Sequence, residues 1–167
     1  MQTFPSTFIW RHRKENLKKC SLQGLQHRED ISFFSYPNQA LPPLNSYVIL
    51  SPEASQSLSI KDQDKGLLIL DATWRYAYTM KKNLPITPST CFRYLPETYQ
   101  TAYPRKAPDC LTPSRNLASV EALFLSYYIL ERPVDGLLTH YYWKNNFLEK
   151  NFSSPIKTST SRPLICN

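Results

Sequence analysis

Glycine is scarce in this chain of 167 residues, which contains only Gly24, Gly66 and Gly136. Neither the G-x-G-x-x-G loop of dinucleotide-binding folds nor the G-x-x-x-x-G-K-[ST] phosphate loop can be written with them. This scarcity excludes Rossmann dehydrogenases and P-loop nucleotide triphosphatases. An adenosine-type cofactor would have to be held by apolar walls and ordinary backbone groups.

Cysteine is also sparse, and the four cysteines are far apart: Cys20, Cys91, Cys110 and Cys166. Because no two of them have C-x-x-C spacing, we expect reduced thiols and no metal site. Long apolar runs are missing as well, since a bilayer span needs about 18 consecutive apolar residues. The N-terminal segment lacks the charged-then-apolar order of a signal peptide. These absences predict a cytoplasmic protein with no membrane partner.

Positive charge, in contrast, is in excess, with a formal net charge of +7. The basic residues form two groups along the chain: Arg11, Arg13, Lys14, Lys18 and Lys19, then Lys81, Lys82, Arg93, Arg105, Lys106 and Arg115. Such clustering is the usual electrostatic footprint of a polyanionic partner, most often nucleic acid. A solvated basic face without a partner is the alternative.

The most informative segment is the apolar run 67–70, which follows Gly66 and breaks at Asp71, Thr73 and Trp74. A short apolar run bounded in this way is typical of a buried strand in a parallel sheet. Ligands of open α/β sheets bind where such strands end. Asp71 and Trp74 are therefore candidate site residues. The alternative is that Asp71 caps the loop, bonding Thr73, while Trp74 fills the core.

The first half of the chain has the pattern of an α/β protein, which at this length forms one compact domain or two lobes sharing a core. Besides the strand that begins at Gly66, apolar and aromatic runs predict strands at 7–10, 31–36, 47–50 and 91–94. We expect helices at 75–83 and at 53–58, the latter with Pro52 at its first position. The basic segment 14–25 is a helix or a loop.

The second half changes to helical periodicity. Apolar residues recur at spacings of three and four: Val120, Leu123, Phe124, Tyr127 and Tyr128. This spacing predicts an amphipathic helix with Ser119 near its start and Pro133 after its end. The same spacing continues through 134–150. After Asn151 the chain has no periodic face, which predicts a mobile tail.

Seven short motifs occur in a characteristic order between residues 9 and 151. They are N-L-K-K-C-S (16–21), L-S-P (50–52), L-S-I-K-D (58–62), D-A-T-W (71–74), R-Y-L-P (93–96), L-A-S-V-E-A (117–122) and Y-W-K-N-N-F-L-E-K-N (142–151). Together they resemble the small-subunit ribosomal RNA aminocarboxypropyltransferases, which form a superfamily with the DTW-domain tRNA-uridine aminocarboxypropyltransferases. The resemblance lies in the ordered set, because each motif alone is short.

The resemblance implies an α/β fold with a parallel-sheet N-terminal lobe and a helical C-terminal lobe, SPOUT-like and tied in a trefoil knot. The boundaries that follow are 1–96 for the α/β lobe, 97–151 for the helical lobe and 152–167 for a flexible tail. In the family, S-adenosylmethionine binds between the lobes. The family members resemble monomers more than the dimeric knotted methyltransferases.

The resemblance also implies which residues bind S-adenosylmethionine as group donor. They are Ser21, Leu50, Pro52, Thr73, Trp74, Leu95, Leu117, Ser119 and Ala122. Trp74 can attract the sulfonium by a cation–π contact of roughly 0.5–2 kcal/mol. If Trp74 and Ala122 bury the methyl group, the aminocarboxypropyl arm faces the substrate. Asp71 is the candidate general base or electrostatic support, and Glu121 matches a polar position of the family signature.

The implied reaction is transfer of a 3-amino-3-carboxypropyl group to a base nitrogen of a uridine-type nucleotide, with methylthioadenosine leaving. The implied partner is structured RNA, small-subunit rRNA or tRNA. Residues expected to contact it are Arg11, Arg13, Lys18, Lys19, Arg105 and Lys106. The segment 101–116, beside the pocket, departs from the family's pattern, so the resemblance does not identify the target RNA. A knotted RNA methyltransferase and a non-catalytic RNA-binding assembly factor are the alternatives.

Overall fold

The computed structural model describes residues 3–104 and 117–153, and within them five parallel strands form one sheet in the order β2-β1-β4-β3-β5. The strands are β1 (Thr7–His12), β2 (Ile31–Tyr36), β3 (Tyr47–Leu50), β4 (Gly66–Asp71) and β5 (Cys91–Arg93). The predicted parallel α/β class is confirmed. β2 and β3 have the predicted bounds and β4 begins at Gly66 as predicted, whereas β1 is two residues longer and β5 one residue shorter.

Side chains of the central strand β4 alternate between two hydrophobic cores. Leu67 and Ile69 belong to the core that contains the apolar residues of the second half of the chain. Leu68 points to the opposite face and packs with Trp10 and Met80. A strand buried on both faces reads as a continuous apolar run, which explains the sequence 67–70.

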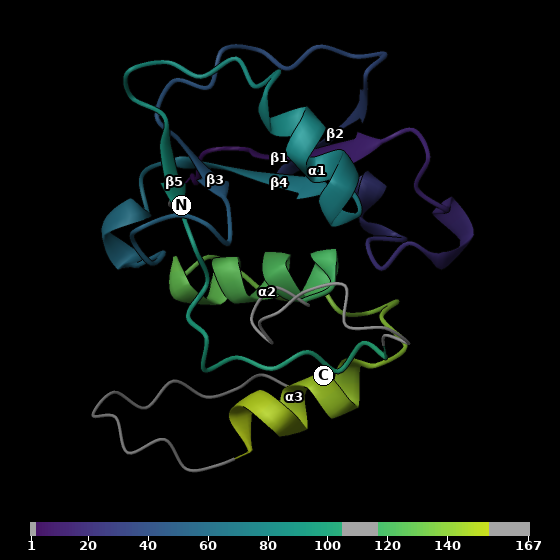
Figure 1. Ribbon diagram of the computed structural model, residues 1–167. Helices are drawn as coiled ribbons and strands as arrows, with labels where there is room; N and C mark the ends of the chain where they lie inside the picture. The colour runs from purple at the N-terminus through teal and green to yellow at the C-terminus, as the bar shows by residue number, and fades with distance from the viewer. Residues whose placement is uncertain (1–2, 105–116, 154–167) are drawn as a thin grey trace.

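Helices cover both faces of this sheet (Figure 1). Helix α1 (Trp74–Lys81) covers one face, α2 (Ser119–Ile129) covers the other, and α3 (Lys144–Phe152) packs outside α2. Because α2 lies between the sheet and α3, it is buried on most of its circumference rather than along one stripe. Phe124 of α2 meets Phe147 of α3 edge to face, with ring centroids 5.9 Å apart.

One predicted helix is absent from the structure, and another is shorter than predicted. Residues 53–58 form turns, in which Ser57 makes a parallel bridge to Tyr94. Residues 134–143 also form turns, and the predicted long helix shortens to α3. Gly136 has a positive φ of 77°, a left-handed conformation that no α-helix accommodates.

The ends of the remaining helices also differ from the predictions. Helix α2 ends at Ile129, before Pro133, because Glu131 adopts a φ of 56°. The first helix runs over 74–81 rather than 75–83. Phe152 belongs to α3 and packs on Tyr128 with ring centroids 5.1 Å apart, so this helix continues two residues beyond its predicted end at 150.

The connections are mostly irregular, with short 3₁₀ helices. They are η1 (Leu17–Lys19), η2 (Leu25–His27) and η3 (Ile60–Asp62). The sheet and the helical layer share one hydrophobic core, which includes Ile9 and Val48 from the sheet and Leu123 and Phe147 from the helices. Among the helices of the described ranges, none has the length and apolar character that a bilayer crossing requires.

Candidate functional site

The carboxylate of Asp71 lies at the carboxyl end of β4, beside the end of β1. In the parallel register Asp71 faces Arg11, and the Arg11 Nε donates to Asp71 Oδ2 at 2.7 Å. The hydroxyl of Ser119, the first residue of α2, donates to Asp71 Oδ1 at 2.7 Å. Asp71 is only 9% exposed at its side chain. It therefore ties the sheet edge to the start of α2.

A third segment joins the same centre through Cys20 and Ser21. The thiol of Cys20 accepts from Arg11 Nη2 at 3.0 Å and lies 3.7 Å from Asp71 Oδ2. Burial raises the pKa of the Cys20 thiol, and the charge of Asp71 raises it further, so the sulfur stays protonated and is no nucleophile. Ser21 Oγ accepts from the Val120 N–H at 3.2 Å. Three of the seven motifs thus meet at one point.

These contacts define what Asp71 can do. Both of its oxygens already accept hydrogen bonds, one of them from a guanidinium. A carboxylate held in this way is suited to fixing its neighbours and supplying negative charge, and less suited to taking up a proton. The expected bond to Thr73 is not its role, because the Thr73 N–H donates to Glu15 Oε1 at 3.0 Å.

Trp74 begins α1 immediately after this edge and is 55% exposed. This exposure rules out the alternative in which the indole fills the core. The guanidinium of Arg75 lies 5.3 Å from the centre of the Trp74 ring. An exposed indole next to a strand end is a surface on which a flat or cationic ligand can lie.

The wall residues Leu50 and Pro52 flank Ser51 at the end of β3, and a polar cluster fixes this turn. Ser51 Oγ donates to Glu53 Oε2 at 2.9 Å and accepts from Lys81 Nζ at 2.8 Å. Lys81 also forms an ion pair with Glu53, which holds the pKa of that carboxyl below its usual value. Sequence reasoning missed this cluster and grouped Lys81 with the nucleic-acid charges. Proximity of Glu53 to Pro52 was the only signal.

On the opposite side, the buried carboxylate of Glu121 in α2 holds the segment that precedes the undescribed residues. Its oxygens accept from Thr101 Oγ1 at 2.7 Å, from the Ala102 N–H at 2.8 Å and from the Ala118 N–H at 2.8 Å. Glu121 thereby fixes 101–102 against the start of α2. Its role is structural support, with no open face for a ligand.

The remaining predicted pocket residues are only partly associated with the hydrophobic core. Leu50, Leu95 and Leu117 are half-buried against the cluster that α2 shares with the sheet. Ala122 is half-buried in α2, whereas Pro52 and Thr73 are exposed. The structure thus brings residues of the sheet edge and of α2 to one hydrophobic cluster. Among the described residues, no group of three His, Cys, Asp or Glu side chains is arranged to hold a metal ion.

The residues expected to face RNA are distributed differently. Arg11 is 14% exposed and is engaged with Asp71, contrary to the expectation that it faces RNA. Arg13 and Lys18 are exposed, and Lys19 ends η1. Arg105 and Lys106 lie outside the described residues.

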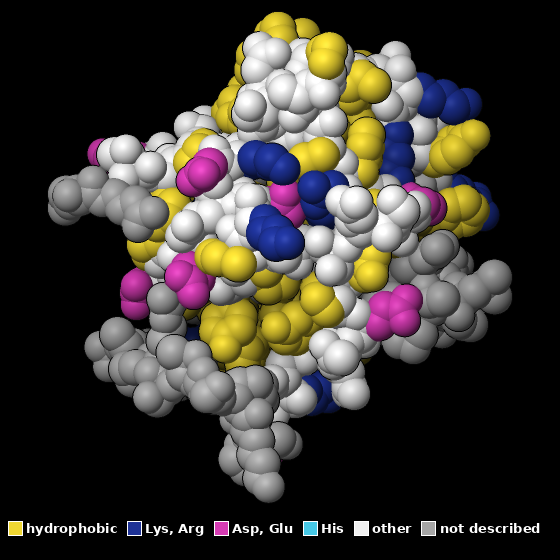
Figure 2. Space-filling view, turned by 90° about the vertical axis from the view of Figure 1, so that its left-hand side faces the viewer, with side chains coloured by type: hydrophobic (Ala, Val, Ile, Leu, Met, Phe, Trp, Pro, Cys, Tyr) yellow, Lys and Arg dark blue, Asp and Glu magenta, His cyan; other side chains and the backbone are white. Residues whose placement is uncertain are grey.

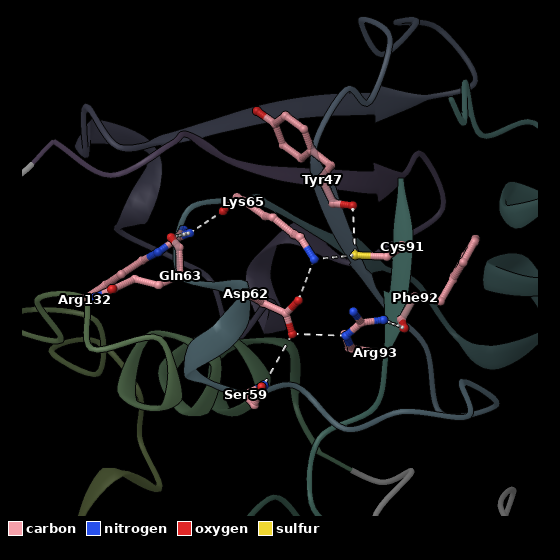
Figure 3. Close-up of polar contacts among 9 residues, drawn as sticks. All are labelled: Tyr47, Ser59, Asp62, Gln63, Lys65, Cys91, Phe92, Arg93 and Arg132. Atoms are coloured by element: carbon pink, nitrogen blue, oxygen red, sulfur yellow. Dashed lines mark hydrogen bonds and ion pairs between the residues drawn. The ribbon is translucent and has the colours of Figure 1, made fainter. Parts of the chain in front are cut away.

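A further buried carboxylate, Asp62 in η3, organises the side of the molecule near β5 (Figure 3). Lys65 Nζ donates to its Oδ1 at 2.8 Å and Arg93 Nε to its Oδ2 at 3.0 Å. Burial by itself raises the pKa of Asp62, but the two cations outweigh it and hold the pKa below its usual value. In Figure 2, Lys and Arg side chains gather around an acidic side chain on this side. The motifs 58–62 and 93–96 meet here.

The fold and the site define an all-parallel α/β protein with polar and aromatic side chains converging at the carboxyl edge of its sheet. Among solved structures, the chain is similar to the SAM-dependent rRNA:acp-transferase Tsr3 from Vulcanisaeta distributa, with a TM-score of 0.66 and 21% sequence identity. The match covers 87% of this chain and 78% of that one. At this identity the likeness establishes the fold. No family model matches the sequence. A search of curated proteins likewise found no match.

Proposed function

We propose that this protein is an S-adenosylmethionine-dependent RNA aminocarboxypropyltransferase. It transfers the 3-amino-3-carboxypropyl group to a base nitrogen of a uridine-type nucleotide in structured RNA, with rRNA favoured over tRNA. The observation that carries the proposal is the convergence of motifs 16–21, 71–74 and 117–122 on Asp71, beside the exposed Trp74. The fold shared with a transferase of this kind supports it.

The residues at this edge fit S-adenosylmethionine by their chemistry. Leu50, Pro52, Leu95 and Leu117 offer apolar surface for an adenosine, which explains how a chain with three glycines binds a nucleoside. When bound, the cofactor supplies an electrophilic carbon activated by its sulfonium. Trp74 attracts that positive charge through its ring face. If Trp74 and Ala122 together shield the methyl group, the aminocarboxypropyl arm would be left facing the RNA.

We infer that Asp71 acts as a positioning residue for this pocket. Its charge holds Arg11 and Ser119, and through Ser119 it sets the start of α2 against the sheet edge. Ser21 does the same from the segment 16–21 by accepting from Val120. The general-base role of Asp71 stays a prediction, which substitution by asparagine tests.

Several finer expectations belong to this proposal. They are the trefoil knot of a SPOUT-like fold, the lobe boundaries at 96 and 151, a monomeric state and a cytoplasmic location. The exposed Arg13 and Lys18 supply charge for RNA on the described surface. Arg105 and Lys106, which are outside the described residues, are expected to add to this charge.

The test uses two preparations of S-adenosylmethionine, one labelled in the carboxyl carbon of its amino acid arm and one in the methyl carbon. The purified protein is incubated with each and with separate tRNA and small-subunit rRNA pools from a strain that lacks the gene. We expect the carboxyl label alone to enter RNA. Incorporation of the methyl label would establish a methyltransferase instead. RNA binding without cofactor binding in calorimetry would establish an assembly factor.

A further inference from the structure

The outward face of α1 exposes two large aromatic rings. Trp74 is 55% and Tyr78 64% exposed, and the two lie one helical turn apart on the same side. Met80, on the inward side of the same helix, is fully buried against the sheet. The exposed rings therefore contribute nothing to the core that α1 completes.

Cations accompany these rings. Lys82 Nζ lies 4.6 Å from the centre of the Tyr78 ring, and the Arg75 guanidinium lies 5.3 Å from that of Trp74. No acidic residue occurs between Thr73 and Asn83. We call Trp74, Arg75, Tyr78 and Lys82 the α1 platform. It alternates flat aromatic surface with positive charge, without an anion among its members.

A neighbouring segment extends the same chemistry from the end of β1. The ring of Tyr76 stacks on His12 with centroids 4.0 Å apart and an interplanar angle of 5°. Lys14 Nζ lies 5.4 Å from the centre of that Tyr76 ring. The stack holds α1 against the end of β1. Helix α1 itself follows directly on the carboxyl end of β4 (Figure 1), so the α1 platform begins close in the chain to Asp71.

We infer that the α1 platform binds unpaired nucleotides of the RNA substrate. Bases stack on the ring of Tyr78 and on the adjoining face of the Trp74 ring, and phosphates pair with Lys82 and Arg75. The inference rests on the proposed function, because it places the RNA next to the transfer site. Charge complementarity selects a polyanion. The flat rings select bases that are not already stacked in a duplex, since single-strand binders combine basic grooves with aromatic stacking surfaces.

The experiment measures binding of the full-length protein to a fluorescein-labelled single-stranded oligouridine RNA and to the same strand in a duplex. Tyr78→Ala should weaken single-strand binding about 5- to 100-fold, because one stacked base is lost. Tyr78→Phe keeps the ring and should bind as the wild type does. Lys82→Met should flatten the slope of log affinity against log salt by roughly 0.7.

The control variant is Tyr142→Ala, which removes a tyrosine that is 86% exposed and lies outside the α1 platform. It should leave RNA binding unchanged. A 2-aminopurine placed in the oligonucleotide reports stacking directly, and its fluorescence should be quenched by the wild type and by Tyr78→Phe but not by Tyr78→Ala. Circular dichroism of each variant checks that the fold is retained.

Three results would overturn the inference: wild-type affinity in Tyr78→Ala, equal affinity for duplex and single strand, or full competition by polyglutamate, which offers charge without bases. Calorimetry with S-adenosylmethionine on the same variants separates this inference from the proposed function. If the cofactor does not bind but RNA binding depends on Tyr78, the proposed function fails and the platform stands. If transfer occurs and Tyr78 has no effect, the platform fails alone.

Discussion

Two aspartates, Asp62 in η3 and Asp71 at the end of β4, are both buried but have different neighbours. Each accepts from an arginine of a strand: Asp62 from Arg93 of β5, and Asp71 from Arg11 of β1. Asp62 has a second cation, Lys65, and a side chain only 2% exposed. Asp71 instead has the hydroxyl of Ser119 and the thiol of Cys20 as its other neighbours.

This difference separates a structural ion-pair cluster at Asp62 from a candidate functional site at Asp71. Two cations on the Asp62 carboxylate join η3 to β5, as Figure 3 shows. Mixed partners at Asp71 join three segments next to Trp74, which presents an open aromatic face. Burial and ion pairing alone do not identify a functional carboxylate. An exposed ligand-binding surface next to the carboxylate, such as the Trp74 ring, identifies it.

The largest effect on stability should come from Asp62→Asn. The substitution leaves Lys65 and Arg93 without their carboxylate, so we expect the free energy of unfolding to fall by roughly 2–4 kcal/mol. Urea denaturation followed by circular dichroism measures it. The matched control is Asp64→Asn, two residues away and exposed, which should change stability by less than about 0.5 kcal/mol.

The same variant has a predicted pH signature. Because the folded-state pKa of Asp62 is below its usual value, its stabilising contribution is present above about pH 4 and is lost as the pH falls through the folded pKa. The wild type should lose stability in acid, and Asp62→Asn should lose less over the same range. If the free energy of unfolding fell equally with pH in the two proteins, the stabilising role of the Asp62 ion pairs would be contradicted.

The next effect concerns Asp71→Asn. If Asp71 is a positioning residue, this change should lower the free energy of unfolding by about 1–3 kcal/mol and weaken S-adenosylmethionine binding and transfer together. Ser119→Ala, which removes one contact to the same carboxylate, should reproduce a smaller version of both losses. A loss confined to turnover, with binding intact, would show instead that the carboxylate acts in the transition state.

The strands were predictable because short apolar runs between turn residues encode them, as at 47–50 and 66–71. No helix forms at 53–58, and the helix predicted over 134–150 begins only at Lys144. Lys81, distant in sequence, holds the turn at Ser51 and Glu53, and Gly136 takes a left-handed conformation. Periodicity reports on neither. The positions of Asp71 and Trp74 at a strand end could be predicted, but the inward orientation of Arg11 depends on strand order.

Trp74→Ala should act on binding and hardly on stability, in contrast to the aspartate variants. We expect S-adenosylmethionine affinity to fall by about 1–2 kcal/mol, since an aromatic surface and its cation–π contact are lost together. Calorimetry without RNA measures this change. Trp74→Phe should retain a large part of the affinity, and Tyr78→Ala, one turn away, should retain all of it. Wild-type affinity in Trp74→Ala would remove the indole from the pocket.

The smallest effect should come from Lys81→Met, because the ion pair with Glu53 is partly exposed and such pairs contribute only about 0.2–1 kcal/mol. This variant is informative when it is compared with Lys82→Met.

Lys81 supports the Ser51 turn beside Pro52, so its loss should weaken S-adenosylmethionine binding about 2- to 5-fold and leave RNA binding unchanged. Lys82→Met should do the reverse, because that side chain faces outward over Tyr78. The pKa of Glu53, followed by NMR titration, should rise toward its usual value only in Lys81→Met, since Lys81 is what lowers it. Equal effects of the two lysines on both ligands would mean that neither the turn nor the α1 platform is selective.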